Sequence, residues 1–441
     1  MVSAGLLTFL MLAVLILIIL LDFPIGLALA GTAMIFGTIF VGPQITSSFM
    51  LRMHVTFADY ILIAIPLFIF MGVIVEKSGL ATKLYDAMFI IFGGLRGGLA
   101  IATVVACTIF AAATGVVGAT VVTMGMMSLP SMVKYKYNQS LCAGSICAGG
   151  ALGILIPPSI MILVYAPTAN VSVGAMLIGA FVPGFFLALM YIIYIAVRCL
   201  IIPTDGPAIE KELLSQYSAW DRIKLIFTSV LPVAGLILAV LGSIFFGLAS
   251  PTEAASLGAF FAVFLALAYR GLTWKGVREA CINTVTTTCM VMLVMVGAAF
   301  FTSVFMRLGC GAVVEDVILG LPFGKWGILA VMWFIIFIMG AFIDWIGIVM
   351  IVVPLFSPIA VKLGFDPIWF AIMNIIVMQT SFLTPPFAYS IFYLKGIAPP
   401  EMTLMHIYKG VIPFILIIIV TVIILTAFPQ IVMWAPSHFV G

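Results

Sequence analysis

The chain is poor in charge. Only 7% of its 441 residues are Asp, Glu, Lys or Arg, whereas a soluble domain carries about 25%. The formal net charge of +3 is small and dispersed, which argues against a basic surface that binds nucleic acid. With 65% hydrophobic residues, this scarcity of charge indicates an integral membrane protein.

Residues typical of metal sites and of catalysis are scarce too. The three histidines, His54, His406 and His438, lie far apart in the sequence, which argues against a zinc site. The seven cysteines are odd in number and lack metal-ligand spacing, so we interpret them as packing residues. No paired aspartates and no Gly-x-Ser-x-Gly turn occur. An enzyme is therefore not expected, and neither is a cofactor.

What the sequence does contain is long apolar runs. Their lengths suit helices that cross about 30 Å of hydrocarbon, and they lack the alternation of a barrel strand. The predicted fold class is an all-α integral membrane protein with about ten full crossings. These cover residues 5–21, 25–41, 59–75, 140–166, 174–200, 225–246, 252–269, 281–306, 367–394 and 404–428. Two further apolar pairs, 97–130 and 326–361, each contain a short polar or Gly-containing interruption.

Two halves of the sequence resemble each other. The pairs Pro157-Pro158 and Pro385-Pro386 lie 228 positions apart. Nearly the same shift relates further residues: Gly98 to Gly327, Gly118 to Gly347, Pro130 to Pro358 and Pro183 to Pro413. A proline pair breaks a helix, which a membrane tolerates only where the freed carbonyls are buried in protein or face a cavity. Matching breaks in two halves are typical of the binding site of a secondary transporter.

The distribution of Lys and Arg predicts the orientation. With the N-terminus outside, fourteen basic residues fall on the cytoplasmic side and four on the external side, as the positive-inside rule requires. Both termini are then predicted to face the outside. Five crossings separate the repeat starts near positions 59 and 281, so the two copies have opposite orientations. An inverted-topology repeat of this kind is the architecture of alternating-access transporters.

The two interrupted pairs can be full spans or re-entrant hairpins, since both satisfy the charge pattern. The small residues of 111–118 favour hairpin tips at mid-depth, because small side chains permit close backbone approach. The predicted organisation is a transmembrane pair (1–58), repeat 1 (59–202, with hairpin 97–130 and broken helix 140–166), a cytoplasmic linker and central pair (203–280), repeat 2 (281–428, with hairpin 326–361 and broken helix 367–394) and a tail (429–441). The hydrophilic stretch 203–224 is interpreted as a solvated connector with a short amphipathic helix, and a regulatory role is the alternative.

Each hairpin tip is expected to face the broken crossing of its own repeat. Unwound carbonyls and nearby hydroxyls suit a hard cation such as Na⁺, and half-helix N-termini attract a substrate carboxylate. Simple kinking explains any one break equally well, although not a symmetric pair. The residues predicted to bind the cation are Thr114, Gly115, Gly118, Gly150, Gly153, Pro157, Asp344, Gly347, Thr384 and Pro385. The residues predicted to bind substrate are Ser159, Arg307 and Ser381.

Two of these residues carry charge. Asp344 is the only charged residue between Trp326 and Val361, and a carboxylate at the bilayer centre is costly unless paired, hydrated or bound to a cation. A helix cap is the alternative role, and it is compatible with a sodium site. Arg307 ends an apolar crossing, where it can meet an anionic substrate or simply extend to the interface.

The stretch Leu152–Ser159, followed by Tyr165 and by Ala180–Gly184, resembles the large membrane subunit of tripartite ATP-independent periplasmic (TRAP) transporters. The segments 251–255 and 383–399 fit as well, and the resemblance covers nearly the whole chain. It implies a sodium-coupled importer in the bacterial inner membrane. It also implies two partners, a small four-span membrane subunit and a periplasmic substrate-binding protein.

At the first tip this sequence reads Thr114-Gly115-Val116-Val117, where the family usually has Ser-Gly-Ser-Ser. Backbone carbonyls would then contribute more to cation binding. The stretch 382–396 looks like a subgroup labelled for mannitol, chloroaromatic or 2-oxo acid substrates, which favours a small organic acid, such as a monocarboxylate. The alternatives are a sodium/carboxylate symporter that needs no binding protein and a passive channel.

Overall fold

The structure is a computed structural model that describes residues 3–209, 218–385 and 388–439. This part of the chain is helical and contains no strand, so the predicted all-α class is confirmed. Seven described helices are long and apolar enough to cross a membrane. They cover Tyr60–Lys77, Val173–Ile201, Trp220–Phe245, Pro251–Ala268, Trp274–Arg307, Trp345–Lys362 and Leu404–Ala427.

The two repeats contain the same succession of helices. The first consists of η1 (Tyr60–Ile63), α4 (Ala64–Lys77), α5 (Leu80–Phe92), α6 (Gly98–Thr114), α7 (Val117–Lys134), α8 (Gln139–Ala151), η2 (Leu152–Ile154), α9 (Ile160–Ala169) and α10 (Val173–Ile201). The second consists of α14 (Trp274–Arg307), α15 (Cys310–Leu319), α16 (Lys325–Gly340), α17 (Trp345–Lys362), α18 (Pro367–Met378), η4 (Gln379–Phe382), α19 (Tyr389–Ile397) and α20 (Leu404–Ala427). In both copies a glycine with positive φ, Gly79 (76°) or Gly309 (78°), turns the chain into the second helix.

The remaining helices flank the repeats. They are α1 (Ala4–Leu20), α2 (Ile25–Phe40), α3 (Ile45–Phe57), η3 (Pro203–Asp205), α12 (Ala219–Phe245), α13 (Pro251–Ala268) and α21 (Gln430–Phe439). Four of the described α-helices lie outside the predicted spans: α3, α5, α15 and α21. The predicted tail at 429–441 contains the helix α21, which packs against α10. In the predicted linker, residues 210–217 lie outside the described residues, and α12 already begins at Ala219 behind a Ser218–Asp221 capping box.

The two repeats pack against each other through matching pairs of helices. In one pair α8 lies on α20, where a Cβ atom on Gly144 would stand 2.2 Å from the carbonyl oxygen of Gly410. In the equivalent pair α18 lies on α10, where a Cβ atom on Gly179 would stand 2.5 Å from Ile372 Cδ1. Glycine at positions 144 and 179 therefore allows the helices of the two repeats to pack closely.

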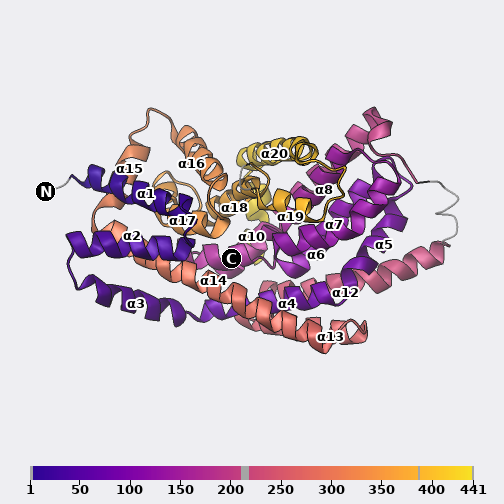
Figure 1. The fold of residues 1–441 in the computed structure, drawn as a ribbon, viewed down its shortest axis with the longest axis horizontal. Coiled ribbons are helices and arrows are strands. Elements are labelled where there is room, and N and C mark those ends of the chain that lie inside the picture. The colour runs from indigo at the N-terminus through magenta and orange to yellow at the C-terminus, as the bar shows by residue number, and fades with distance from the viewer. Residues whose placement is uncertain (1–2, 210–217, 386–387, 440–441) are drawn as a thin grey trace.

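The second half of each broken crossing packs against the hairpin of the other repeat. The helix α9 packs on α17, and α19 packs on α7. Figure 1 shows the hairpin α6–α7 and the hairpin α16–α17 on opposite sides of the molecule, with α18 and α19 between them. Beside them, α14 packs along α2 and α4, and α13 packs along α4. The broken crossings thus join the two hairpins into one unit.

Candidate functional site: two hairpin tips and two helix breaks

The first tip meets the first break through backbone atoms. Gly115 ends α6 with a left-handed φ of 64°. A Cβ atom on Gly115 would stand 2.8 Å from the carbonyl oxygen of Pro158, so only glycine fits this approach. The contact confirms that this tip faces the break of its own repeat. Carbonyl oxygens and unwound backbone therefore lie together at one place, which is the donor type that a hard cation requires.

The hydroxyl groups of the first site are already engaged by the protein. Thr114 Oγ1 donates to the Phe110 carbonyl at 3.1 Å and lies 3.1 Å from Thr120 Oγ1. Ser159 is fully buried, and its hydroxyl donates to the Ile154 carbonyl across the break. Ser159 thus closes the break itself, and binding substrate would require this hydrogen bond to open. The substrate role of Ser159 stays a prediction.

Three glycines and a proline complete the first set, and their surroundings differ. A Cβ atom on Gly150 would stand 2.3 Å from Val121 Cγ2, so Gly150 serves close packing with α7. A Cβ atom on Gly153 would have its nearest neighbour, Ala111 Cβ, at 3.5 Å. Pro157 is buried in the break. Gly118 instead packs against Tyr393 of the second repeat.

The second break is lined by polar groups without partners. A Cβ atom on Gly340 would stand 1.8 Å from Ser381 Oγ, so the end of α16 lies directly on η4. Within the described part of the chain, Ser381 Oγ and both amide atoms of Gln379 have no hydrogen-bond partner. Gln379 is 0% exposed. Buried polar groups are normally satisfied, and two such residues side by side indicate a place for a polar or ionic ligand.

The other residues predicted for the second site occupy varied positions. Thr384 Oγ1 donates to the Thr380 carbonyl at 2.7 Å, and Pro385 is exposed. A Cβ atom on Gly347 would meet Ile343 and Ile25 of α2 first, at 2.7 Å and 3.2 Å. Pro386 of the sequence motif lies outside the described residues.

Asp344 lies at the start of α17, where it occupies the N-cap position, with φ −63° and ψ 152°. Its carboxylate lies near the backbone N–H groups of Trp345 and Ile346, but among the described residues no capping hydrogen bond forms. The side chain is half-buried. Asp344 therefore places a carboxylate at the second tip, at the first turn of α17.

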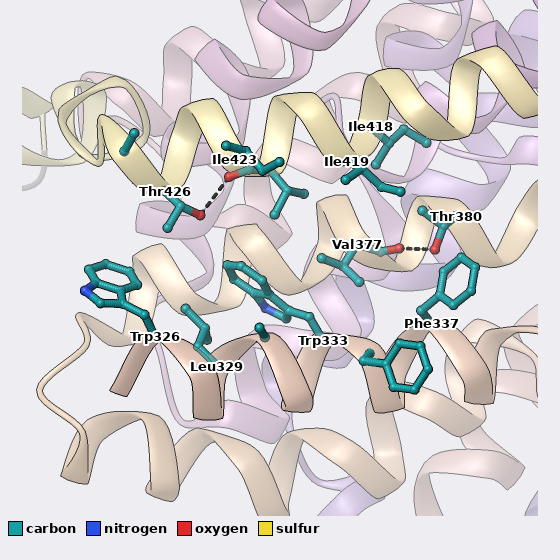
Figure 2. A pocket seen from close by; sticks show the side chains of 14 residues that line it. Trp326, Leu329, Trp333, Phe337, Val377, Thr380, Ile418, Ile419, Ile423 and Thr426 are labelled. Atoms are coloured by element: carbon teal, nitrogen blue, oxygen red, sulfur yellow. Dashed lines mark hydrogen bonds between the residues drawn. The ribbon is translucent and has the colours of Figure 1, made fainter. Parts of the chain in front are cut away.

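Two large cavities lie beside the hairpins, and one of them reaches Thr380 of the second break. One, of about 930 Å³, separates α14 and α3 from α9 and α17, and Arg52, Asp59, Asn170, Thr302 and Lys362 are among its lining residues. Arg307 is exposed at the end of α14 and is not part of this lining. The other cavity, of about 830 Å³, lies between α16, α18 and α20 and is mainly apolar (Figure 2).

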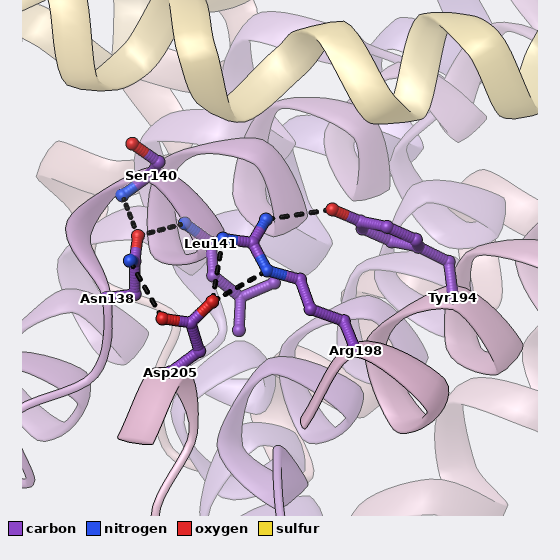
Figure 3. Close-up of polar contacts among 6 residues, drawn as sticks. All are labelled: Asn138, Ser140, Leu141, Tyr194, Arg198 and Asp205. Atoms are coloured by element: carbon purple, nitrogen blue, oxygen red, sulfur yellow. Dashed lines mark hydrogen bonds and ion pairs between the residues drawn. The ribbon is translucent and has the colours of Figure 1, made fainter. Parts of the chain in front are cut away.

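A polar cluster fixes the base of the first hairpin (Figure 3). Asn138 caps α8 by accepting from the backbone N–H of Ser140 at 2.9 Å, and its amide donates to Asp205 at 2.9 Å. Arg198, near the end of α10, donates to the same carboxylate at 2.8 Å through Nε and lies 2.8 Å from it through Nη2. The backbone N–H of Gly97 also donates to the Gly206 carbonyl at 2.7 Å. The start of the linker therefore ties together α6, α8 and α10.

Gln379 and Tyr393 are not among the site residues predicted from the sequence. Gln379 has a weak signal, since it is an uncharged amide in an apolar run. The position of Tyr393 gives no signal, because its partner Gly118 lies in the other repeat.

Two repeats that each bring a hairpin tip to a helix break are typical of a secondary membrane transporter. The chain belongs to the DctM component family of tripartite ATP-independent periplasmic transporters, whose family model matches residues 12–431. It is therefore a multi-pass protein of the inner membrane and a transporter permease subunit.

Named relatives agree with this assignment. The chain is 33% identical to the C4-dicarboxylate TRAP transporter large permease protein DctM of Pseudomonas aeruginosa, over 94% of this chain and 93% of that protein. It is 29% identical to the ectoine TRAP transporter large permease protein TeaC of Halomonas elongata, over 97% and 98% of the two chains. The solved YdaH transporter of Alcanivorax borkumensis shares the fold alone, with a TM-score of 0.61, 15% identity and 90% coverage of both chains.

Proposed function

We propose that this large permease subunit imports a small organic acid by sodium-coupled alternating access. The observation that carries the proposal is that in both repeats a hairpin tip touches a broken crossing, at Gly115 with Pro158 and at Gly340 with Ser381. Alternating access in inverted-repeat transporters works around sites of this kind. Sodium is favoured over protons because the tips and breaks are rich in backbone carbonyls and hold one carboxylate, Asp344.

The proposed sodium ligands divide between the two repeats. At the first tip the ligands come mainly from backbone carbonyls around Gly115 and Pro157, since the Thr114 hydroxyl is internally bonded. At the second, Asp344 contributes charge, and the unpartnered atoms of Ser381 and Gln379 provide oxygen donors. The sodium-binding assignments of Gly118, Gly150, Gly153, Gly347, Thr384 and Pro385 rest on their place in the tips and breaks.

The proposed substrate is an organic acid, and a monocarboxylate such as a 2-oxo acid is preferred. Relatives are named for C4-dicarboxylates and for ectoine, so family membership allows several substrate classes. Arg307 and Ser381 remain the proposed contacts for the substrate carboxylate.

The proposed complex contains two partners, a small four-span membrane subunit and a periplasmic substrate-binding protein. Both termini of this chain are proposed to face the periplasm, following the distribution of basic residues.

Reconstitution tests this function directly. The binding protein is screened with organic acids, and uptake of the ligand found is measured in liposomes that contain the permease. Uptake should require the permease, the small subunit and the binding protein together. Uptake by the permease without a binding protein would favour the carboxylate symporter. Equilibration without any ion gradient would favour a channel.

A further inference from the structure

The apolar cavity between α16, α18 and α20 lies apart from the two tips. Its 830 Å³ are bounded by bulky side chains on all three helices, among them Leu329, Trp333 and Phe337 of α16 (Figure 2). The two threonines in its lining satisfy their own hydroxyls: Thr380 Oγ1 donates to the Val377 carbonyl and Thr426 Oγ1 to the Val422 carbonyl. The lining therefore offers no free hydroxyl to a polar ligand and suits a hydrocarbon chain.

The cavity has the length of one membrane leaflet. Its lining on α16 runs from Trp326 to Phe337, which at the helical rise corresponds to about 16 Å. One leaflet of a bilayer contributes about 15 Å of hydrocarbon. Two of its own lining residues, Phe334 and Ile423, are 62% and 61% exposed, so the cavity is open to the apolar outer surface.

One end of the cavity has the features of a membrane interface. Trp326, Phe365 and Trp369 form an aromatic cluster there, with ring centroids 5.1 to 6.4 Å apart. Tryptophan is enriched where membranes meet water. Lys325 Nζ lies over this cluster, 5.4 Å from the Trp326 ring, and within the described residues no carboxylate is paired with it. A cation without a protein counter-ion therefore stands at the mouth of an apolar slot.

We propose that this cavity binds one acyl chain of an anionic membrane phospholipid whose headgroup phosphate lies at Lys325. The length of the slot fits the chain, and the lysine complements the charge of the headgroup. A transmembrane helix of another subunit is the less suitable occupant, because helix pairing in membranes uses small residues that let backbones approach. Here the lining is formed mainly by Trp, Phe, Leu and Ile.

The inner end of the slot reaches Thr380, next to Ser381 in the second break. A bound chain would therefore pack against η4 as well as against α16 and α20. This placement predicts that lipid occupancy raises the thermal stability of the permease.

Native mass spectrometry of the detergent-purified full chain, after incubation with phosphatidylglycerol or phosphatidylcholine, tests this site. Wild type should retain one phosphatidylglycerol at least tenfold better than phosphatidylcholine. Ala330→Trp, which fills the slot, should lose the retained lipid, whereas Ala268→Trp, on an exposed position of α13, should keep it. Lys325→Glu should abolish the preference for phosphatidylglycerol, whereas Lys275→Glu at the exposed start of α14 should preserve it.

Two results would overturn the proposal. One is equal retention of lipid by Ala330→Trp and Ala268→Trp, with Lys325→Glu unchanged in its preference. The other comes from the same measurement on the complex of the full chain with its small membrane subunit: release of that subunit by Ala330→Trp with lipid retention unaffected would assign the slot to a protein helix. Lys325→Glu changes only an exposed side chain, so its result is independent of any folding defect in Ala330→Trp.

Discussion

The ring of Tyr393 packs on Gly118, so a residue of the second repeat rests on the first hairpin tip. A Cβ atom on Gly118 would stand 2.9 Å from the Tyr393 ring. Tyr393 belongs to α19, the second half of the second broken crossing, and α19 packs on α7 of the first hairpin. Movement of the first tip relative to the second break would therefore change this contact.

A larger side chain at position 118 should separate the first tip from α19. In Gly118→Leu the new side chain displaces the Tyr393 ring, and we expect uptake to fall at least tenfold while the protein still inserts and purifies normally. Uptake is measured in liposomes, and size-exclusion chromatography shows whether the variant assembles normally. Gly235→Leu is the control, because no atom lies within 4 Å of a Cβ atom at Gly235. Equal uptake by the two variants would show that the Tyr393 contact has no role in transport.

Asp344→Asn tests the charge at the second tip. Asparagine keeps the shape and much of the capping capacity of aspartate but removes the negative charge. We expect normal assembly with a sodium requirement raised at least tenfold, measured as the dependence of uptake on sodium concentration. Asp316→Asn, at an exposed position of α15, should behave as wild type. An unchanged sodium requirement in Asp344→Asn would leave Asp344 as a helix-start residue only.

The contact between Gly144 and Gly410 predicts a stability effect. A methyl group at position 144 would meet the Gly410 carbonyl oxygen at 2.2 Å, and backbone cannot yield as a side chain can. We expect Gly144→Ala to lower the free energy of unfolding by about 1–3 kcal/mol, seen as a lower Tm in detergent. Gly242→Ala, which has open space around it, should keep or raise the Tm. A Tm for Gly144→Ala equal to that of wild type would contradict the tight α8–α20 interface.

The Arg198–Asp205 pair should contribute more to the free energy of unfolding than an exposed ion pair does. The two side chains are 22% and 13% exposed, and Asp205 also accepts from Asn138. Asp205→Ala leaves a partly buried guanidinium without its carboxylate, and we expect a loss of about 2 kcal/mol. Removing the exposed Lys77–Glu279 pair through Glu279→Ala should cost less than about 1 kcal/mol. Chemical unfolding of both variants measures the difference, and equal losses would contradict a structural role for the cluster.

The sequence predicted the parts of the fold that leave a compositional mark. Proline pairs located both breaks, and the run of small residues before Gly115 located the first tip. The helices α5 and α15 leave little mark, because they are short and follow glycines that can turn either way. The crossing of α9 onto α17 also escaped prediction, because a repeat reveals which segments are equivalent but not which segments touch. Gln379 was overlooked because an uncharged amide carries no obvious cost in an apolar run.

We propose that two matched tip-and-break sites couple transport to sodium. The most direct measurement is uptake of the binding protein's ligand into liposomes that contain both membrane subunits, with an inward sodium gradient or an inward proton gradient in sodium-free buffer. We predict accumulation with the sodium gradient and none with the proton gradient alone. Equal accumulation driven by a proton gradient without sodium would contradict sodium coupling.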